Sequence, residues 1–133
     1  MKQEKKYKAK ILIVEDDEDT RDIYCKALSM NEFETISAVN GKDGLEKSIK
    51  EVPDLILLDI LMPIMDGFAM LKKLREEKEP AKNIPVIMLT NLSADSDDII
   101  TKAVDTGLVY YLVKASISVT QLVSKVKESL NLK

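Results

Sequence analysis

The segment Asp54–Gly67, which reads DLILLDILMPIMDG, carries the clearest fold signal in the chain. Its continuous apolar run, Leu55–Leu58, is typical of a strand buried on both faces, as strands are in a parallel sheet. Asp59 follows this run directly, and the pair Asp66-Gly67 is typical of a turn before the next element. The segment therefore predicts a buried strand that ends in a carboxylate.

Short strand-like stretches recur along the chain, at Ile11–Val14, Phe33–Val39, Leu55–Leu58, Val86–Leu89 and Tyr110–Val113. Each is followed by a segment with helical spacing of apolar residues, namely Asp17–Met30, Asn40–Glu51, Gly67–Lys78, Ser96–Asp105 and Ser118–Leu130. This alternation predicts a doubly wound α/β fold, a five-stranded parallel sheet with helices on both faces. A closed barrel would need about eight such units, more than this chain holds.

Helical spacing also predicts which side chains face the core. On the first predicted helix, one side carries apolar residues that we expect to pack against the sheet: Ile23, Ala27 and Met30. On the third, we interpret a group of basic residues as a solvated face: Lys72, Lys73 and Arg75.

The composition excludes several functional classes. The chain has 133 residues, the size of one domain, and 20 Lys+Arg against 23 Asp+Glu give a net charge of −3. This balance argues against nucleic acid as a direct ligand. The absence of histidine excludes histidine-based acid–base chemistry and zinc sites of the histidine type. The single Cys25 excludes an internal disulfide and fits a reducing cytosol.

The ends of the chain lead to expectations about its organisation. Residues 1–7 are basic and are predicted to form a flexible tail, with residues 8–133 as the folded domain. The first apolar run, Ile11–Val14, is too short for a signal peptide or a membrane helix, so we expect a cytoplasmic protein without a membrane partner. Only Asn131-Leu132-Lys133 follow the last predicted helix, so we expect a stand-alone domain without an effector domain.

Polar residues stand at the carboxyl ends of four predicted strands: Glu15-Asp16, Asp59, Thr90 and Lys114. This edge is where open α/β sheets bind ligands. Two unit charges 4 Å apart repel by about 4 kcal/mol at an effective dielectric of 20, so clustered carboxylates need a cation. Hard oxygen ligands favour Mg²⁺. Together with a hydroxyl and an ammonium group, the site suits transfer of a phosphoryl group to a carboxylate.

Each of these residues alone also has a simpler interpretation. Acids after the first strand are common as helix caps and as partners of the helix dipole. Asp59 is also compatible with a turn, Thr90 with a strand end and Lys114 with a solvated loop. Their arrival at one edge of the sheet favours a common site over these separate explanations.

These motifs resemble the receiver domain of two-component response regulators, over nearly the whole chain from about Lys8 to Leu132. The matching segments are ILIVEDD (Ile11–Asp17), Asp54–Gly67, PVIMLT (Pro85–Thr90), and Gly107 followed by YYLVK (Tyr110–Lys114). The resemblance implies the flavodoxin-like receiver fold of the chemotaxis-regulator type. It also implies a phosphoacceptor signalling domain rather than an enzyme. Such a domain assists only its own phosphorylation and slow dephosphorylation.

The resemblance assigns roles residue by residue. Asp59 is the implied phosphoacceptor, and Thr90 and Lys114 contact the phosphoryl oxygens. Mg²⁺ is implied at Asp16, Asp59 and the Ile60 backbone carbonyl, with Glu15 acting mainly through water. Thr90 and the aromatic residue Tyr111 form the implied switch.

The implied partners are a sensor histidine kinase or phosphotransfer protein and a downstream protein that the sequence does not identify. Phosphorylation is expected to reshape a face made of Ser96–Asp105, Tyr110–Val113 and Ser118–Leu130. A phosphorylation-dependent homodimer through this face is compatible with the sequence.

The chain departs from the family pattern at four positions. Ala115 stands where the family usually has a proline after a cis bond, which leaves open whether Lys114–Ala115 is cis or Lys114 is presented differently. Asn91 replaces a small residue and is expected to narrow the site. Leu61 and Leu92 are apolar where such domains place the hydrolytic water, which predicts slow self-dephosphorylation.

Two other functional classes are alternatives to a phosphorylated switch. One is a pseudo-receiver, which has the same fold and docks proteins without being phosphorylated. The other is an enzyme, which the sequence disfavours. A phosphatase with an Asp nucleophile needs a second acid where Leu61 stands, and a nucleotide-binding protein needs a glycine-rich first turn in place of Glu15-Asp16-Asp17.

Overall fold

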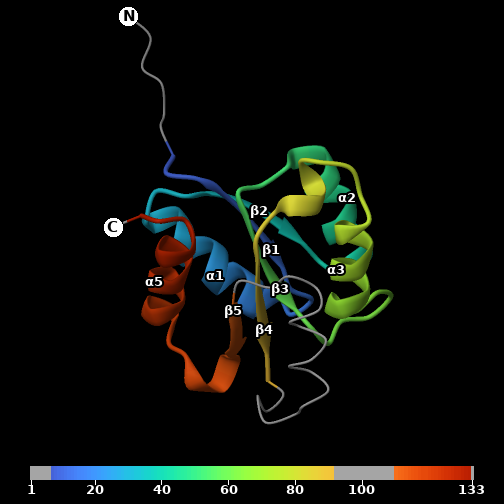
Figure 1. Ribbon diagram of the computed structural model, residues 1–133. Coiled ribbons are helices and arrows are strands. Elements are labelled where there is room, and N and C mark those ends of the chain that lie inside the picture. Colours follow the sequence, from blue (N-terminus) through green and yellow to red (C-terminus); the bar gives the residue numbers. More distant parts are fainter. Residues whose placement is uncertain (1–6, 92–109, 133) are drawn as a thin grey trace, which may run out of the picture.

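The computed structural model describes residues 7–91 and 110–132, which form one sheet of five strands (Figure 1). The strands are β1 (Lys10–Val14), β2 (Glu34–Ala38), β3 (Leu55–Asp59), β4 (Val86–Thr90) and β5 (Tyr110–Val113). They lie in the order β2-β1-β3-β4-β5, and every pairing is parallel. The predicted five-stranded parallel sheet is therefore confirmed.

Helices cover both faces of this sheet (Figure 1). α1 (Glu18–Met30) and α5 (Val119–Ser129) contact each other on one face, and α2 (Gly41–Glu51) and α3 (Gly67–Arg75) contact each other on the other face. Two short 3₁₀ turns, Ala81–Asn83 and Lys114–Ser116, precede β4 and follow β5. The helix predicted at Ser96–Asp105 lies outside the described residues.

Polar caps start the four helices close to the ends of the strands that precede them. The side chains of Asp17, Asn40, Asp66 and Ser118 each accept a hydrogen bond from a backbone N–H in the first turn of their helix. In α5, Gln121 also reaches back to the N-cap backbone and completes the predicted capping box. Because α1, α2 and α3 each start just after a strand ends, their N-termini and the strand ends share one edge of the molecule.

The apolar residues of β3 divide between the two layers of the core. Ile56 and Leu58 belong to the cluster under α2 and α3, while Leu55 and Leu57 belong to the cluster under α1 and α5. All four are fully buried, as the continuous apolar run predicted. β3 is thus a central strand packed on both faces, and its last residue, Asp59, is buried at the carboxyl end of the sheet.

The predicted inward side of α1 is wrong in part. Ile23 is 52% exposed and Met30 is 75% exposed, while Tyr24 and Leu28 pack against the core together with Ala27. The apolar spacing of the sequence allows both rotations of the helix, and packing against β-strands and α5 selects the one that turns Tyr24 inward.

The predicted solvated face of α3 is wrong for Arg75. The helix ends at Arg75 rather than at Lys78. The Arg75 guanidinium is half-buried and donates hydrogen bonds to the backbone carbonyls of Lys82 (3.0 Å) and Ile84 (2.7 Å). Arg75 therefore ties the end of α3 to the segment that leads into β4, while Lys72 and Lys73 are exposed as predicted.

Candidate functional site

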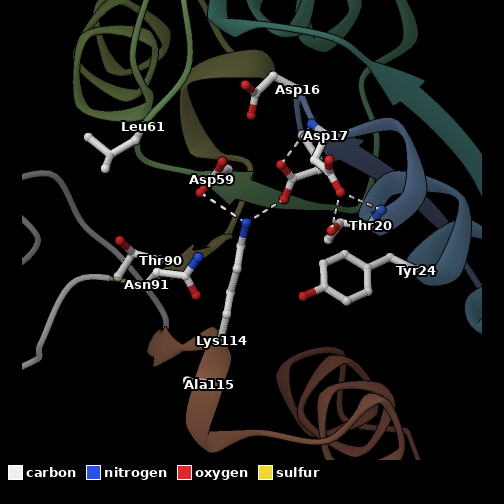
Figure 2. A pocket seen from close by; sticks show the side chains of 11 residues that line it. Asp16, Asp17, Thr20, Tyr24, Asp59, Leu61, Thr90, Asn91, Lys114 and Ala115 are labelled. Carbon is white, nitrogen blue, oxygen red and sulfur yellow. Dashed lines mark hydrogen bonds and ion pairs between the residues drawn. The ribbon is translucent and has the colours of Figure 1, made fainter.

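The register of the sheet brings the predicted site residues to one edge. Val14 pairs with Leu58, so Glu15 follows β1 beside Asp59, the last residue of β3. Thr90 pairs with Val113, so Lys114 follows β5 beside the end of β4. A pocket of about 500 Å³ opens at this edge (Figure 2), lined by Glu15, Asp16, Asp17, Thr20, Tyr24, Asp59, Leu61, Thr90, Asn91, Lys114 and Ala115.

Lys114 bridges two buried carboxylates in this pocket (Figure 2). Its Nζ lies 2.5 Å from Glu15 Oε1 and 3.3 Å from Asp59 Oδ1. The side chain of Glu15 is only 3% exposed and that of Asp59 only 9%. Burial of two carboxylates is tolerated when a cation is paired with them, and Lys114 supplies one positive charge to both.

Backbone N–H groups hold the two carboxylates in place. Asp59 Oδ1 accepts a hydrogen bond from the backbone N–H of Ile60 at 2.9 Å. Glu15 Oε2 accepts one from the backbone N–H of Asp17 at 3.1 Å. Both carboxylates are therefore oriented before any ligand binds.

The electrostatics of the pocket act most strongly on Asp59. Burial, together with the charge of Glu15, raises the pKa of Asp59 to about 7 even though Lys114 opposes the change. Burial disfavours the charged form of Lys114, but the hydrogen bond to Glu15 and the charges of Asp59 and Glu15 raise its pKa overall. Lys114 is therefore protonated at neutral pH, whereas the ionised form of Asp59 needs more positive charge than Lys114 provides.

The same pocket contains a donor set that fits a divalent cation. One carboxylate oxygen from each of Glu15, Asp16 and Asp59 lies within 4.8 Å of the other two. Asp16 is exposed, and its carboxylate makes no hydrogen bond or ion pair with the described residues. Figure 2 shows it turned away from Lys114. These oxygen ligands suit Mg²⁺, which binds one or two carboxylates and keeps several waters.

The Ile60 carbonyl, the fourth predicted metal ligand, is already engaged. It accepts a hydrogen bond from the backbone N–H of Gly67 at 2.8 Å, and on this loop the pocket is lined by Leu61. Contact between this carbonyl and a metal stays a prediction. Gly67 is needed here, because a Cβ on it would lie 2.3 Å from the Asp59 carbonyl oxygen.

The two predicted switch residues lie on neighbouring strands. Thr90 is fully buried at the end of β4 and lines the pocket. Tyr111 on β5 is partly buried against the core cluster under α2 and α3, and its hydroxyl is buried without a hydrogen-bond partner among residues 7–91 and 110–132. A buried phenol without a partner is costly, so a second position for this ring is physically reasonable.

Three of the four positions that depart from the family pattern line the pocket, namely Leu61, Asn91 and Ala115. Among the described residues the only cis peptide bond is Glu79–Pro80, so Lys114–Ala115 is trans and Lys114 still reaches Asp59. Asn91 and Leu61 both line the pocket, and the side chain of Leu61 is largely exposed. Leu92 lies outside the described residues.

Sequence reasoning placed Asp17 at the start of the first helix, but it did not assign Thr20 and Tyr24 of α1 to the pocket. Asp17 caps the helix, and Thr20 donates to its carboxylate through both the backbone N–H (2.9 Å) and the hydroxyl (2.6 Å). These hydrogen bonds lower the pKa of Asp17. Tyr24 follows one turn later and lines the pocket as well. A residue four after Thr20 falls on the same helix side, so this spacing was the available signal.

The chain belongs to the response regulator receiver domain family, whose model matches residues 11–127. Its curated relatives include the DNA-binding dual master transcriptional regulator RpaA of Synechocystis, 37% identical over 105 residues that make up 79% of this chain and 42% of that protein. Response regulator PleD of Caulobacter vibrioides is 31% identical over 117 residues, 80% of this chain and 26% of that protein.

Solved structures show the same fold. A CheY-like receiver domain protein from Methanospirillum hungatei has a TM-score of 0.83 and 29% identity, covering 92% of this chain and 93% of that one. The signal receiver domain of a histidine kinase from Syntrophus aciditrophicus has a TM-score of 0.80 and 32% identity, covering 92% and 90%. These likenesses confirm the predicted CheY-like receiver fold.

The chain spans about two-fifths or less of the length of these curated relatives. The expectation that it is a stand-alone protein therefore stays a prediction, as does the absence of an effector domain or of direct nucleic-acid binding. Among the described residues, no helix has the length and apolar character needed to cross a membrane.

Proposed function

We propose that this receiver domain accepts a phosphoryl group on Asp59 from the phosphohistidine of a sensor kinase or phosphotransfer protein, with Mg²⁺ bound. The observation that carries the proposal is the pairing of Lys114 Nζ with Asp59 Oδ1 at 3.3 Å, in a pocket that also gathers the carboxylates of Glu15 and Asp16. A docking surface alone does not require this arrangement. Burying two carboxylates with one cation costs desolvation free energy, and groups perturbed in this way cluster at functional sites.

The transfer follows from the positions of these groups. A carboxylate oxygen of Asp59 attacks the phosphorus, the P–N bond of the donor breaks, and its electron pair returns to the imidazole of the partner protein. Lys114 and the Thr90 hydroxyl then contact the phosphoryl oxygens. Mg²⁺, held by Asp16 and Asp59 with Glu15 acting mainly through water, would neutralise charge on the reacting phosphoryl group.

Phosphorylation acts as a switch by shifting a population between two states. Contact with the phosphoryl group draws Thr90 inward, and Tyr111 turns further into the space beside it. Because β5 and α5 carry Tyr111 and its neighbours, the surface they form changes for a downstream protein or for a second copy of the chain. The bound phosphoryl group has to favour the active state by a few kcal/mol.

The proposal is tested by incubating the protein with acetyl phosphate in Mg²⁺ or in EDTA and measuring the intact mass. We expect a mass increase of one phosphoryl group that needs both Mg²⁺ and Asp59, so that Asp59→Asn stays unmodified. If no phosphoryl group is gained from acetyl phosphate or from a phosphorylated histidine donor, the chain is a docking module of the pseudo-receiver kind instead.

The predicted slow self-dephosphorylation belongs to the same proposal. Leu61 lines the pocket with an apolar side chain that offers no hydrogen bond to a hydrolytic water. We expect phospho-Asp59 to decay more slowly in the natural chain than in a Leu92→Glu variant. Equal or slower decay in the variant would count against this expectation.

A further inference from the structure

Tyr24 stands at the phosphoacceptor pocket without a role in the mechanism above. It comes from the middle of α1, and its ring is half-buried against the core cluster under α1 and α5. It lines the pocket together with Asp59, Lys114 and Thr20. Figure 2 shows its hydroxyl directed into the pocket, toward the side chain of Lys114.

The hydroxyl is available for a ligand. It makes no hydrogen bond with any of the described residues, and it is not among their buried side-chain atoms that lack a partner. Burial raises the pKa of Tyr24, with the charge of Lys114 opposing and those of Glu15 and Asp59 adding to the effect. The phenol therefore keeps its proton at neutral pH and is a hydrogen-bond donor.

The pocket is electrostatically unfavourable for an anionic phosphodonor. The carboxylates of Glu15, Asp16 and Asp59 repel it, and Lys114 already contacts two of them. The walls formed by Leu61 and Ala115 offer no polar side-chain atom. A neutral donor on the α1 wall stabilises the incoming anion without adding a charge that competes for the carboxylates.

We propose that Tyr24 is a binding residue of this site, whose hydroxyl donates a hydrogen bond to the anionic phosphodonor as it approaches Asp59. The inference rests on the proposed phosphoacceptor function and extends it to the binding of the donor. The ring of Tyr24 has a separate role in packing α1. Tyr24→Phe separates the two roles, because it removes the hydroxyl and keeps the ring.

The test measures the rate of phosphorylation against acetyl phosphate concentration in Mg²⁺ for the natural chain, Tyr24→Phe and Tyr7→Phe. Tyr7 is the matched control, because the same hydroxyl is removed from an exposed residue that does not line the pocket. Loss of one hydrogen bond to the donor should raise the half-saturating concentration in Tyr24→Phe by about three- to tenfold. The saturated rate should stay within about twofold, because ground-state and transition-state binding weaken equally.

Four results would overturn the inference. An unchanged half-saturating concentration in Tyr24→Phe means that the hydroxyl does not bind the donor, and the same increase in Tyr7→Phe means that the effect is not local. A lower saturated rate with unchanged half-saturation assigns Tyr24 to the chemistry or to placing Lys114. If the natural chain gains no Asp59-dependent phosphoryl group, the proposed function fails first and this inference fails with it.

Discussion

The sheet pairs a lysine with two acidic residues at each of its two edges. At the amino edge, Lys10 Nζ lies 3.6 Å from Glu51 Oε1, and the Lys10 backbone N–H donates to Asp54 Oδ2 at 2.7 Å. At the carboxyl edge, Lys114 contacts both Glu15 and Asp59. The residue types are the same, but among the residues that the structure describes, clustered carboxylates line a pocket at the carboxyl edge only.

The two edges differ in how far their charged side chains are exposed to solvent. The side chains of Lys10 and Glu51 are 29% and 37% exposed, whereas that of Glu15 is 3% exposed. An exposed ion pair contributes about 0–1 kcal/mol to the free energy of unfolding, because water stabilises the two separate charges almost as well as their pairing does. Buried carboxylates depend on their partner, so a change in the cation or in the charge on Asp59 changes the free energy of the whole edge.

Replacing the lysine at each edge should give the largest difference in the free energy of unfolding between the two edges. Lys114→Ala leaves Glu15 and Asp59 without their cation, and we expect it to lower the free energy of unfolding by about 2–4 kcal/mol at pH 8 in EDTA. Lys10→Ala should cost less than about 1 kcal/mol. Urea denaturation of both variants measures this. Equal losses would show that the carboxyl edge is as well solvated as the amino edge.

Removing the charge of Asp59 should have a smaller effect of opposite sign. The pKa of Asp59 is about 7 in the folded protein against 3.8 as a model value, so the folded state holds a proton that the unfolded state lacks between these limits. Stability in EDTA therefore falls as pH rises from about 4 to about 7, and the penalty is complete above that range. Asp59→Asn should stabilise the protein at pH 8 by about 1–2 kcal/mol, after allowing for solvent screening.

The difference between Asp59→Asn and the natural chain should thus be near zero below pH 4 and largest above pH 7. Asp54→Asn is the control, because its exposed carboxylate lies at the opposite edge. Urea midpoints as a function of pH provide the measurement. A gain from Asp54→Asn equal to that from Asp59→Asn would show that neither effect comes from the buried pocket.

Magnesium should stabilise the carboxyl edge only, by an amount similar to or smaller than the effect of Asp59→Asn. At a concentration ten times its dissociation constant, a ligand that binds only the folded state adds about 1.4 kcal/mol. We expect this gain in the natural chain and in Lys10→Ala, and its loss in Asp16→Asn, whose carboxylate is open to a cation. Thermal unfolding in Mg²⁺ and in EDTA distinguishes these cases, and a full gain in Asp16→Asn would contradict the assigned ligand set.

The sequence predicted the carboxyl edge well because its residues are marked by their position. Asp59, Thr90 and Lys114 each follow a continuous apolar run, and parallel strands bring such ends together whatever the details of packing. Strand bounds were correct to within a residue, with β2 shorter than predicted at both ends.

Contributions from the helices were harder to predict because they depend on tertiary packing. The apolar spacing of α1 favoured Ile23 as an inward residue, so Tyr24 was missed although it lines the pocket. Arg75 was interpreted as solvated because nothing in its local sequence shows that the backbone before β4 passes beside it. Two carbonyls of that backbone accept hydrogen bonds from the Arg75 guanidinium.

We expect the phosphoryl group to be accepted by Asp59 in the buried carboxyl edge, and not by any other acidic residue of the chain. The direct measurement is the intact mass after treatment with acetyl phosphate and Mg²⁺ for the natural chain, Asp59→Asn and Asp54→Asn. We expect one added phosphoryl group in the natural chain and in Asp54→Asn, and none in Asp59→Asn. A phosphoryl group retained in Asp59→Asn, or lost only in Asp54→Asn, would contradict this expectation.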